Sequence, residues 1–236
     1  MKGGASMFYF FLVLAVVFAV IFTIRRGKKT DTVSLLLKVI ASFCFILLGV
    51  SGFLLGKTYS MSLTLLVIIG LVCGLIGDIY LDMKFVYAQD DTIHTFTGFG
   101  AFMLGHIFYI LFLFLCYGIH PLALIVAVAA GIVIGIAIYL TPKLMKLDYG
   151  RFRMISSIYA GILVFVTVYA LMLEIAYGHT AAKLLFAVGL VLFLISDLIL
   201  SQIYFGKDKN TTTNKILNHA AYYAAQILIA SSIYFL

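Results

Sequence analysis

Long apolar stretches fill most of the chain, and each is about as long as a bilayer is thick. A helix needs about 20 predominantly apolar residues to cross a membrane. Short segments with charged residues, glycine or proline separate the stretches, and none is long enough to divide soluble domains. We therefore expect an all-α, polytopic transmembrane bundle of eight helices, forming one integral membrane domain over residues 1–236. The predicted spans are 7–24, 33–55, 60–82, 95–117, 121–140, 153–176, 181–204 and 215–236.

The composition agrees with a membrane protein and affects how the positive net charge is interpreted. Hydrophobic residues make up 64% of the chain and charged residues only 11%, although the net charge is +7. A cationic soluble surface would suggest nucleic acid, but here the cations lie in short loops between apolar stretches, where they set topology. We expect membrane lipids and no nucleic acid as partners. The three cysteines lie in separate spans without CxxC spacing, which indicates neither a disulfide framework nor a zinc site.

The distribution of lysine and arginine predicts the orientation. Only Lys2, Lys57 and Lys183 fall on one side of the predicted membrane, and Lys38 falls within a span. Positive residues favour the cytosolic side, so both termini should face away from the cytosol in a multi-pass protein, of the cell membrane if the source is bacterial. The loops on the predicted cytosolic side carry Arg25, Arg26, Lys28, Lys29, Lys84, Lys143, Lys146, Arg151, Arg153, Lys207, Lys209 and Lys215.

Two apolar stretches, one in each half of the chain, carry a single carboxylate in matching surroundings. Asp78 follows Gly77 in the third span, and Asp197 follows Ser196 in the seventh. A carboxylate inside a membrane costs about 2.5–3.5 kcal/mol on insertion scales, so two of them indicate a paired functional site. Both spans run in the same direction, so the halves could be parallel four-helix repeats about an axis along the membrane normal. Such a repeat would bring both carboxylates to equal depth, near the cytosolic surface.

Two further charged residues lie near this depth. Lys38 could extend its ammonium group to the cytosolic headgroups or form an ion pair with an aspartate. Asp82 lies four residues after Asp78 and shares its helix face, so it is either a solvated helix end or a member of the site.

Uncharged polar residues occur in pairs on two other spans. His106 and Tyr109 are three residues apart, and Tyr222 and Gln226 are four apart, so each pair shares one helix face. Taken alone, such residues more often form hydrogen bonds between helices than bind ligands. The histidines are scattered singly, with no HxxxH or HExxH pattern, so we expect no metal and no cofactor.

These motifs together resemble the YhhN family, the lysoplasmalogenase-type membrane proteins. Many members have a proline after the lysine of the second span, where this chain has Val39. The resemblance implies eight spans and hydrolysis of the vinyl ether bond of a lysophospholipid, the lysoplasmalogen. The products would be a fatty aldehyde and glycerophosphoethanolamine or -choline. The resemblance rests on Gly77-Asp78-x-x-Leu81, Gly98-x-x-x-Phe102-x-x-x-His106-x-x-Tyr109, Ser196-Asp197-Leu198 and Tyr222-Tyr223-Ala224-Ala225-Gln226-Ile227-Leu228-Ile229-Ala230.

The chemistry of vinyl ether hydrolysis suits a pair of carboxylates. Protonation of the alkene carbon gives an oxocarbenium ion, water adds, and the hemiacetal collapses to aldehyde and alcohol. One carboxylic acid supplies the proton, and a second carboxylate steadies the cation and activates the water, as in glycoside hydrolysis. Asp78 and Asp197 would be the catalytic pair, close to the cytosolic leaflet, without an assignment of which is the acid.

Other polar residues would bind and position the substrate. Lys38 could hold the lipid phosphate, and the apolar spans could take up the alkenyl chain. The remaining candidates for positioning the substrate, the water or the carboxylates are His106, Tyr109, Tyr222 and Gln226.

Two alternatives remain open from the sequence. A transporter of small solutes or lipids would suit the parallel repeat, although the chain lacks a pair of spans broken by glycine or proline. An intramembrane aspartyl protease also uses two membrane aspartates, but Ser196 replaces the tyrosine that precedes one of them. The physiological lysolipid and the oligomeric state are also left open.

Overall fold

The computed structural model describes residues 2–56, 61–144 and 146–236, and this part of the chain is helical without strands. The predicted all-α bundle is therefore confirmed. Lys57 and Ser60, the first residue of the third predicted span, lie outside the described residues. The eight α-helices of the described part are α1 (Lys2–Lys28), α2 (Thr32–Leu55), α3 (Met61–Val86), α4 (Asp91–Tyr117), α5 (Pro121–Leu140), α6 (Arg153–Tyr177), α7 (Ala181–Phe205) and α8 (Thr212–Ser232).

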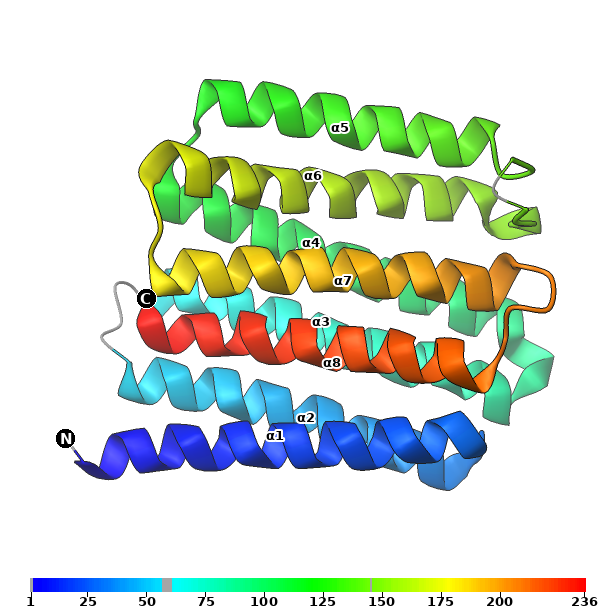
Figure 1. The fold of residues 1–236 in the computed structure, drawn as a ribbon, viewed down its shortest axis with the longest axis horizontal. Coiled ribbons are helices and arrows are strands. Elements are labelled where there is room, and N and C mark those ends of the chain that lie inside the picture. Colours follow the sequence, from blue (N-terminus) through cyan, green and yellow to red (C-terminus); the bar gives the residue numbers. More distant parts are fainter. Residues whose placement is uncertain (1, 57–60, 145) are drawn as a thin grey trace.

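Seven helices of the described part, α1 to α7, are long and apolar enough to cross a membrane, as an integral multi-pass protein requires. Helix α8 was predicted as an eighth span, but it is less apolar than the others. It lies alongside them in the bundle (Figure 1). Its polar side chains are turned inward, since Asn218, His219 and Gln226 are all buried.

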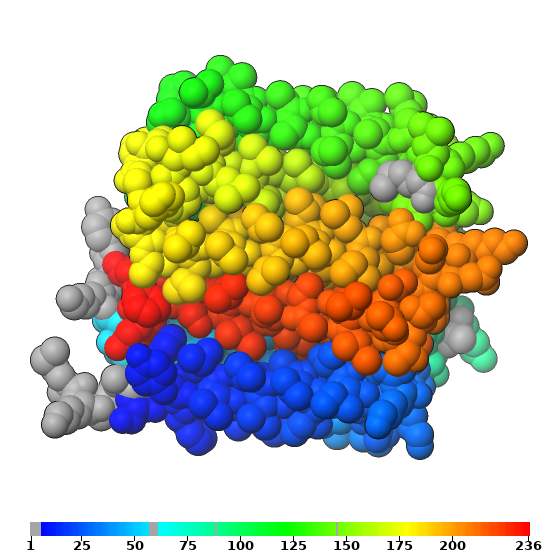
Figure 2. Space-filling view, in the orientation of Figure 1, coloured from blue at the N-terminus to red at the C-terminus, as the bar shows by residue number. Residues whose placement is uncertain are grey.

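Consecutive helices form antiparallel hairpins, and the hairpins pack into one bundle. The two halves, α1–α4 and α5–α8, meet where α2 contacts α8 and α4 contacts α6. In a two-fold repeat α2 corresponds to α6 and α8 to α4, so the α2–α8 contact and the α4–α6 contact are equivalent. The halves also meet where α1 contacts α8, a contact with no counterpart of similar size between α4 and α5 among the described residues. Figure 1 shows both termini at the same end of the bundle, and Figure 2 shows α5, α6, α7, α8 and α1 side by side on one face.

Polar caps begin several helices at the loops. The carboxylate of Asp31 accepts a hydrogen bond from the backbone N–H of Ser34 at 2.8 Å and so caps α2. This bond, the Ser34 hydroxyl and the charge of Arg25 hold the pKa of Asp31 below its usual value. Helix α5 begins with Pro121, whose missing N–H is no loss in the first turn.

Two glycines of α3 let aromatic rings of α4 approach its backbone. A Cβ atom on Gly70 would lie 2.1 Å from the ring of Tyr109, and one on Gly77 would lie 2.6 Å from the ring of Phe102. Both distances are shorter than any ordinary contact, so larger residues would push α4 away from α3. The small residue before Asp78 therefore fixes the spacing of the helices around the site.

Candidate active site

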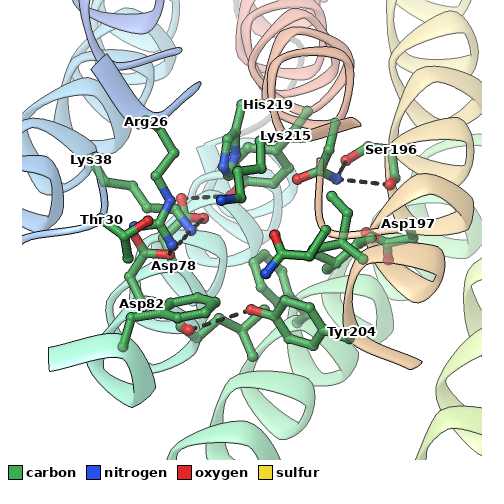
Figure 3. A pocket seen from close by; sticks show the side chains of 18 residues that line it. Arg26, Thr30, Lys38, Asp78, Asp82, Ser196, Asp197, Tyr204, Lys215 and His219 are labelled. Carbon is green, nitrogen blue, oxygen red and sulfur yellow. Dashed lines mark hydrogen bonds and ion pairs between the residues drawn. The ribbon is translucent and has the colours of Figure 1, made fainter. Parts of the chain in front are cut away.

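A cavity of about 140 Å³ opens near the end of the bundle where the α1–α2 and α7–α8 loops lie. Figure 3 shows Arg26, Lys38, Asp78 and Asp82 on one side of it and Asp197 on the other. The charged residues that line it come from α1, α2, α3, α7 and α8: Arg26, Lys38, Asp78, Asp82, Asp197 and Lys215.

Asp78, on α3, is 2% exposed and held by three partners. Its carboxylate lies 3.2 Å from the Lys38 ammonium group. It also accepts hydrogen bonds from the Ser42 hydroxyl at 2.5 Å and the Tyr222 hydroxyl at 2.7 Å. Gln226 donates to the Tyr222 oxygen at 3.0 Å, so this predicted residue supports Asp78 from behind Tyr222. A cation and two hydroxyl groups therefore fix the position of Asp78 and offset its charge.

Lys38 lies between two carboxylates, because its ammonium group is also 3.2 Å from Asp82. The sequence allowed the Lys38 ammonium group to reach the headgroups or to pair with an aspartate, and the structure shows the ion pair. Asp82 is buried and belongs to the same network. Its second partner is Arg26, at 3.2 Å, which also stacks over the ring of Phe85. This role of Arg26 could not be predicted, because in the sequence Arg26 is one of several cations at the end of an apolar stretch.

Asp197, on α7, has different surroundings. It is half-buried and accepts a short hydrogen bond from the hydroxyl of Tyr159 on α6. Within the described residues, no lysine, arginine or histidine forms an ion pair with it. Sequence reasoning missed Tyr159, because nothing in the pattern of α6 distinguishes it from the other tyrosines of the chain.

Asp197 also lines a second cavity of about 190 Å³, between α5, α6 and α7. Apolar side chains such as Ile138, Leu163 and Leu194 form most of its wall. The two cavities share Asp197, Leu200 and Tyr204. Asp197 therefore stands where a polar and an apolar cavity meet.

The two aspartates of the predicted pair thus line one cavity, but through separate networks. Asp78 is bonded to α2 and α8, and Asp197 to α6. Ser196, next to Asp197, accepts hydrogen bonds from the Asn218 amide through its carbonyl oxygen at 2.8 Å and its hydroxyl at 3.0 Å. This contact joins α7 to α8 beside the cavity, and it was not predicted from the sequence.

His106 and Tyr109 share a helix face, as predicted, but they line neither cavity. One ring nitrogen of His106, Nδ1, is 2.7 Å from the carbonyl oxygen of Phe102. The Nε2 atom of His106 and the Tyr109 hydroxyl are buried without a hydrogen-bond partner among the described residues. The His106 ring also contacts those of Tyr159 and Phe193, so it packs behind the site. In the described part of the chain, no three His, Cys, Asp or Glu side chains converge as a metal site would require.

The fold and this cavity define a class: a polytopic helical membrane protein with buried carboxylates around a polar cavity. A family model gives the more specific assignment, since the model of the YhhN family matches residues 33–233. The chain belongs to the YhhN family. No curated protein and no solved structure matches it.

Proposed function

We propose that this protein hydrolyses the vinyl ether bond of a lysoplasmalogen by acid-base catalysis with Asp78 and Asp197. The YhhN family is associated with lysoplasmalogenase activity. The observation that carries the proposal is the position of Asp197, where a polar cavity that contains Asp78 meets an apolar one. A substrate with a charged headgroup and an alkenyl chain needs both kinds of surface, with its reactive bond between them.

In the first step, Asp197 donates its proton to the alkene carbon that is not bonded to oxygen. A C–H bond forms there, and the π electrons of the double bond leave an oxocarbenium ion at the ether carbon. Asp197 suits this step because no cation fixes it as a carboxylate, and it borders the apolar cavity where the alkenyl chain would lie. Tyr159 would orient the Asp197 carboxyl group and hold its negative charge after the transfer.

In the second step, the Asp78 carboxylate steadies the cation and takes a proton from the attacking water. The new C–O bond makes a hemiacetal. In its collapse, the hemiacetal hydroxyl returns a proton to Asp197, and the departing glycerol oxygen takes one from Asp78. Both aspartates end as they began. Lys38, Ser42 and Tyr222 would hold Asp78 in position and stabilise its carboxylate form until it takes the proton of the water.

The proposed orientation places the mouth of the polar cavity at the cytosolic surface. The loops near that mouth carry the excess of lysine and arginine, and both termini lie at the opposite end of the bundle (Figure 1). The substrate would then enter from the cytosolic leaflet with its chain still among the apolar helices.

The test is a comparison of three lysophosphoethanolamines that differ only in the bond to the chain. Purified protein in neutral detergent is incubated with the 1-alkenyl, 1-alkyl and 1-acyl lipids. We expect aldehyde from the alkenyl lipid and no product from the other two. Release of fatty acid from the acyl lipid, or no aldehyde from folded protein, would contradict the proposed reaction.

A further inference from the structure

We infer that Lys215 binds the phosphate of a lipid headgroup at the mouth of the polar cavity. This inference rests on the proposed function for the identity of the lipid. Lys38, the residue first considered for the phosphate, does not suit the role. Its ammonium group lies between Asp78 and Asp82, at 3.2 Å from each, and its side chain is 5% exposed.

Lys215 is the charged residue of the cavity wall that is left for an anionic ligand. It lies in the first turn of α8, is half-buried and lines the cavity (Figure 3). In the described part of the chain, it forms no ion pair. The other cations of the wall, Arg26 and Lys38, are matched by Asp78 and Asp82, so Lys215 is a positive charge without a partner at this end.

Neighbouring groups would complete a phosphate site around Lys215. Arg26 also lines the cavity, but it is paired with Asp82 and is as little exposed as Lys38, so it adds positive charge near the site and no free donor. Asn210, from the α7–α8 loop, and Thr30, from the α1–α2 loop, also line the cavity. Together with Lys215, these two residues bring cationic and neutral hydrogen-bond donors to one end of the cavity, whereas the carboxylates of Asp78 and Asp197 lie further along their helices.

The spacing along α8 fits a lysophospholipid. Lys215 and Tyr222 are two helical turns apart on one face, which corresponds to about 10 Å along the axis. Tyr222 donates a hydrogen bond to Asp78, so this length separates the backbone positions of Lys215 and of a residue that holds Asp78. It is comparable to the distance from the phosphorus to the vinyl carbons in an extended lysoplasmalogen. A phosphate held by Lys215 would therefore place the reactive double bond beside the aspartates.

Binding of non-hydrolysable ligands tests this site separately from the reaction. The probes are 1-O-alkyl lysophosphoethanolamine, 1-O-alkylglycerol with the same chain, and inorganic phosphate. The proteins are the wild type, Lys215→Gln, Lys215→Arg and the control Lys207→Gln, which removes an exposed lysine of the α7–α8 loop that lies outside the cavity. Melting temperatures of all four proteins without ligand establish that each is folded.

We expect the wild type to bind the phospholipid about tenfold or more tightly than the alkylglycerol, as a charge-assisted hydrogen bond would give. Lys215→Gln should lose most of this preference without weakening alkylglycerol binding. Lys207→Gln and Lys215→Arg should keep it. A wild type without the preference, or a Lys215→Gln variant that retains it, would overturn the inference.

The remaining outcomes separate the site from the reaction and identify the source of the phosphate. Loss of the preference in Lys215→Gln, in a protein that releases no aldehyde, would support the phosphate site and contradict the proposed hydrolysis. If the wild type hydrolyses the alkenyl lipid and Lys215→Gln leaves lipid binding unchanged, the result would support the proposed hydrolysis and contradict the phosphate site. The wild type could instead bind inorganic phosphate tightly and show no preference for the phospholipid, with phosphate binding lost in Lys215→Gln. That result would assign the mouth of the cavity to a soluble phosphate and overturn the lipid assignment.

Discussion

Asp78 and Asp197 occupy matching places in the two halves of the chain, and their surroundings differ in a way that suits different tasks. Asp78 is bonded to a lysine and two hydroxyl groups, whereas Asp197 is bonded to one tyrosine hydroxyl and borders an apolar cavity. In each half the preceding helix, α2 or α6, supplies a partner. The repeated sequence thus brings two carboxylates to one cavity, and their partners determine what each can do.

The largest predicted effect is the loss of activity when either carboxyl group is neutralised. Asp78→Asn and Asp197→Asn should each lower turnover by about 10²–10⁴-fold, the usual contribution of a positioned acid or base. Both variants should remain folded, since asparagine retains an oxygen that accepts hydrogen bonds. The matched control is Asp90→Asn, at an exposed position beside α4. Turnover above a few per cent of wild type in either catalytic variant would remove that residue from the mechanism.

The two aspartates should also differ in how strongly their partners stabilise the protein. Lys38→Met leaves two buried carboxylates without their shared cation, and we expect it to lower the free energy of unfolding by about 3 kcal/mol. Tyr159→Phe removes one hydroxyl group, and its cost should be about 1 kcal/mol. Denaturation in detergent measures both changes.

A second substitution checks the cause of the Lys38 effect. Asp78→Asn in the Lys38→Met background removes the carboxylate that has lost its cation, since Asp82 keeps Arg26, and should recover part of the lost stability. If Lys38→Met and Tyr159→Phe cost the same, or if the added asparagine recovers nothing, the difference drawn between the two carboxylates is wrong.

The small residues before the aspartates provide a comparison of packing. A methyl group on Gly77 would meet the ring of Phe102, so Gly77→Ala should cost about 1–3 kcal/mol through overpacking. Ser196→Ala removes only a hydroxyl group that accepts a hydrogen bond from Asn218, and it should cost about 1 kcal/mol or less, because the backbone bond remains. Equal melting temperatures for the two variants would show that α4 adjusts freely to a larger residue at position 77.

The smallest effect is expected at Asp31, which caps α2 and does not line the polar cavity. Its pKa is lowered in the folded protein, so its charged form stabilises the fold above its usual pKa of 3.8, and this contribution falls away as the pH drops below that value. Asp31→Asn should therefore lower the melting temperature slightly at pH 7 and hardly at all in strong acid, with turnover unchanged. A large loss of turnover would show that the α1–α2 loop takes part in the reaction.

Much of the fold could be predicted from the sequence, because apolar stretches of span length allow few structures in a membrane. The cost of a buried carboxylate likewise singled out Asp78 and Asp197. Arg26, Tyr159 and Lys215 could not be found in this way, because their roles depend on which helices become neighbours. For the same reason, helical spacing predicts that His106 and Tyr109 share a face of α4, but not that this face packs behind the cavity. The lower hydropathy of α8 is compatible with its place in the bundle because its polar side chains Asn218, His219 and Gln226 are enclosed by other helices.

The central claim is that a carboxyl group fixed on one side of the substrate protonates the vinyl carbon. Hydrolysis of the alkenyl lipid in D₂O, with immediate reduction of the aldehyde to the alcohol, tests it directly. We predict a single deuterium at the carbon next to the former carbonyl, added to one face only and therefore giving one enantiomer. An unlabelled product, or a racemic label like that from acid in solution, would contradict the account.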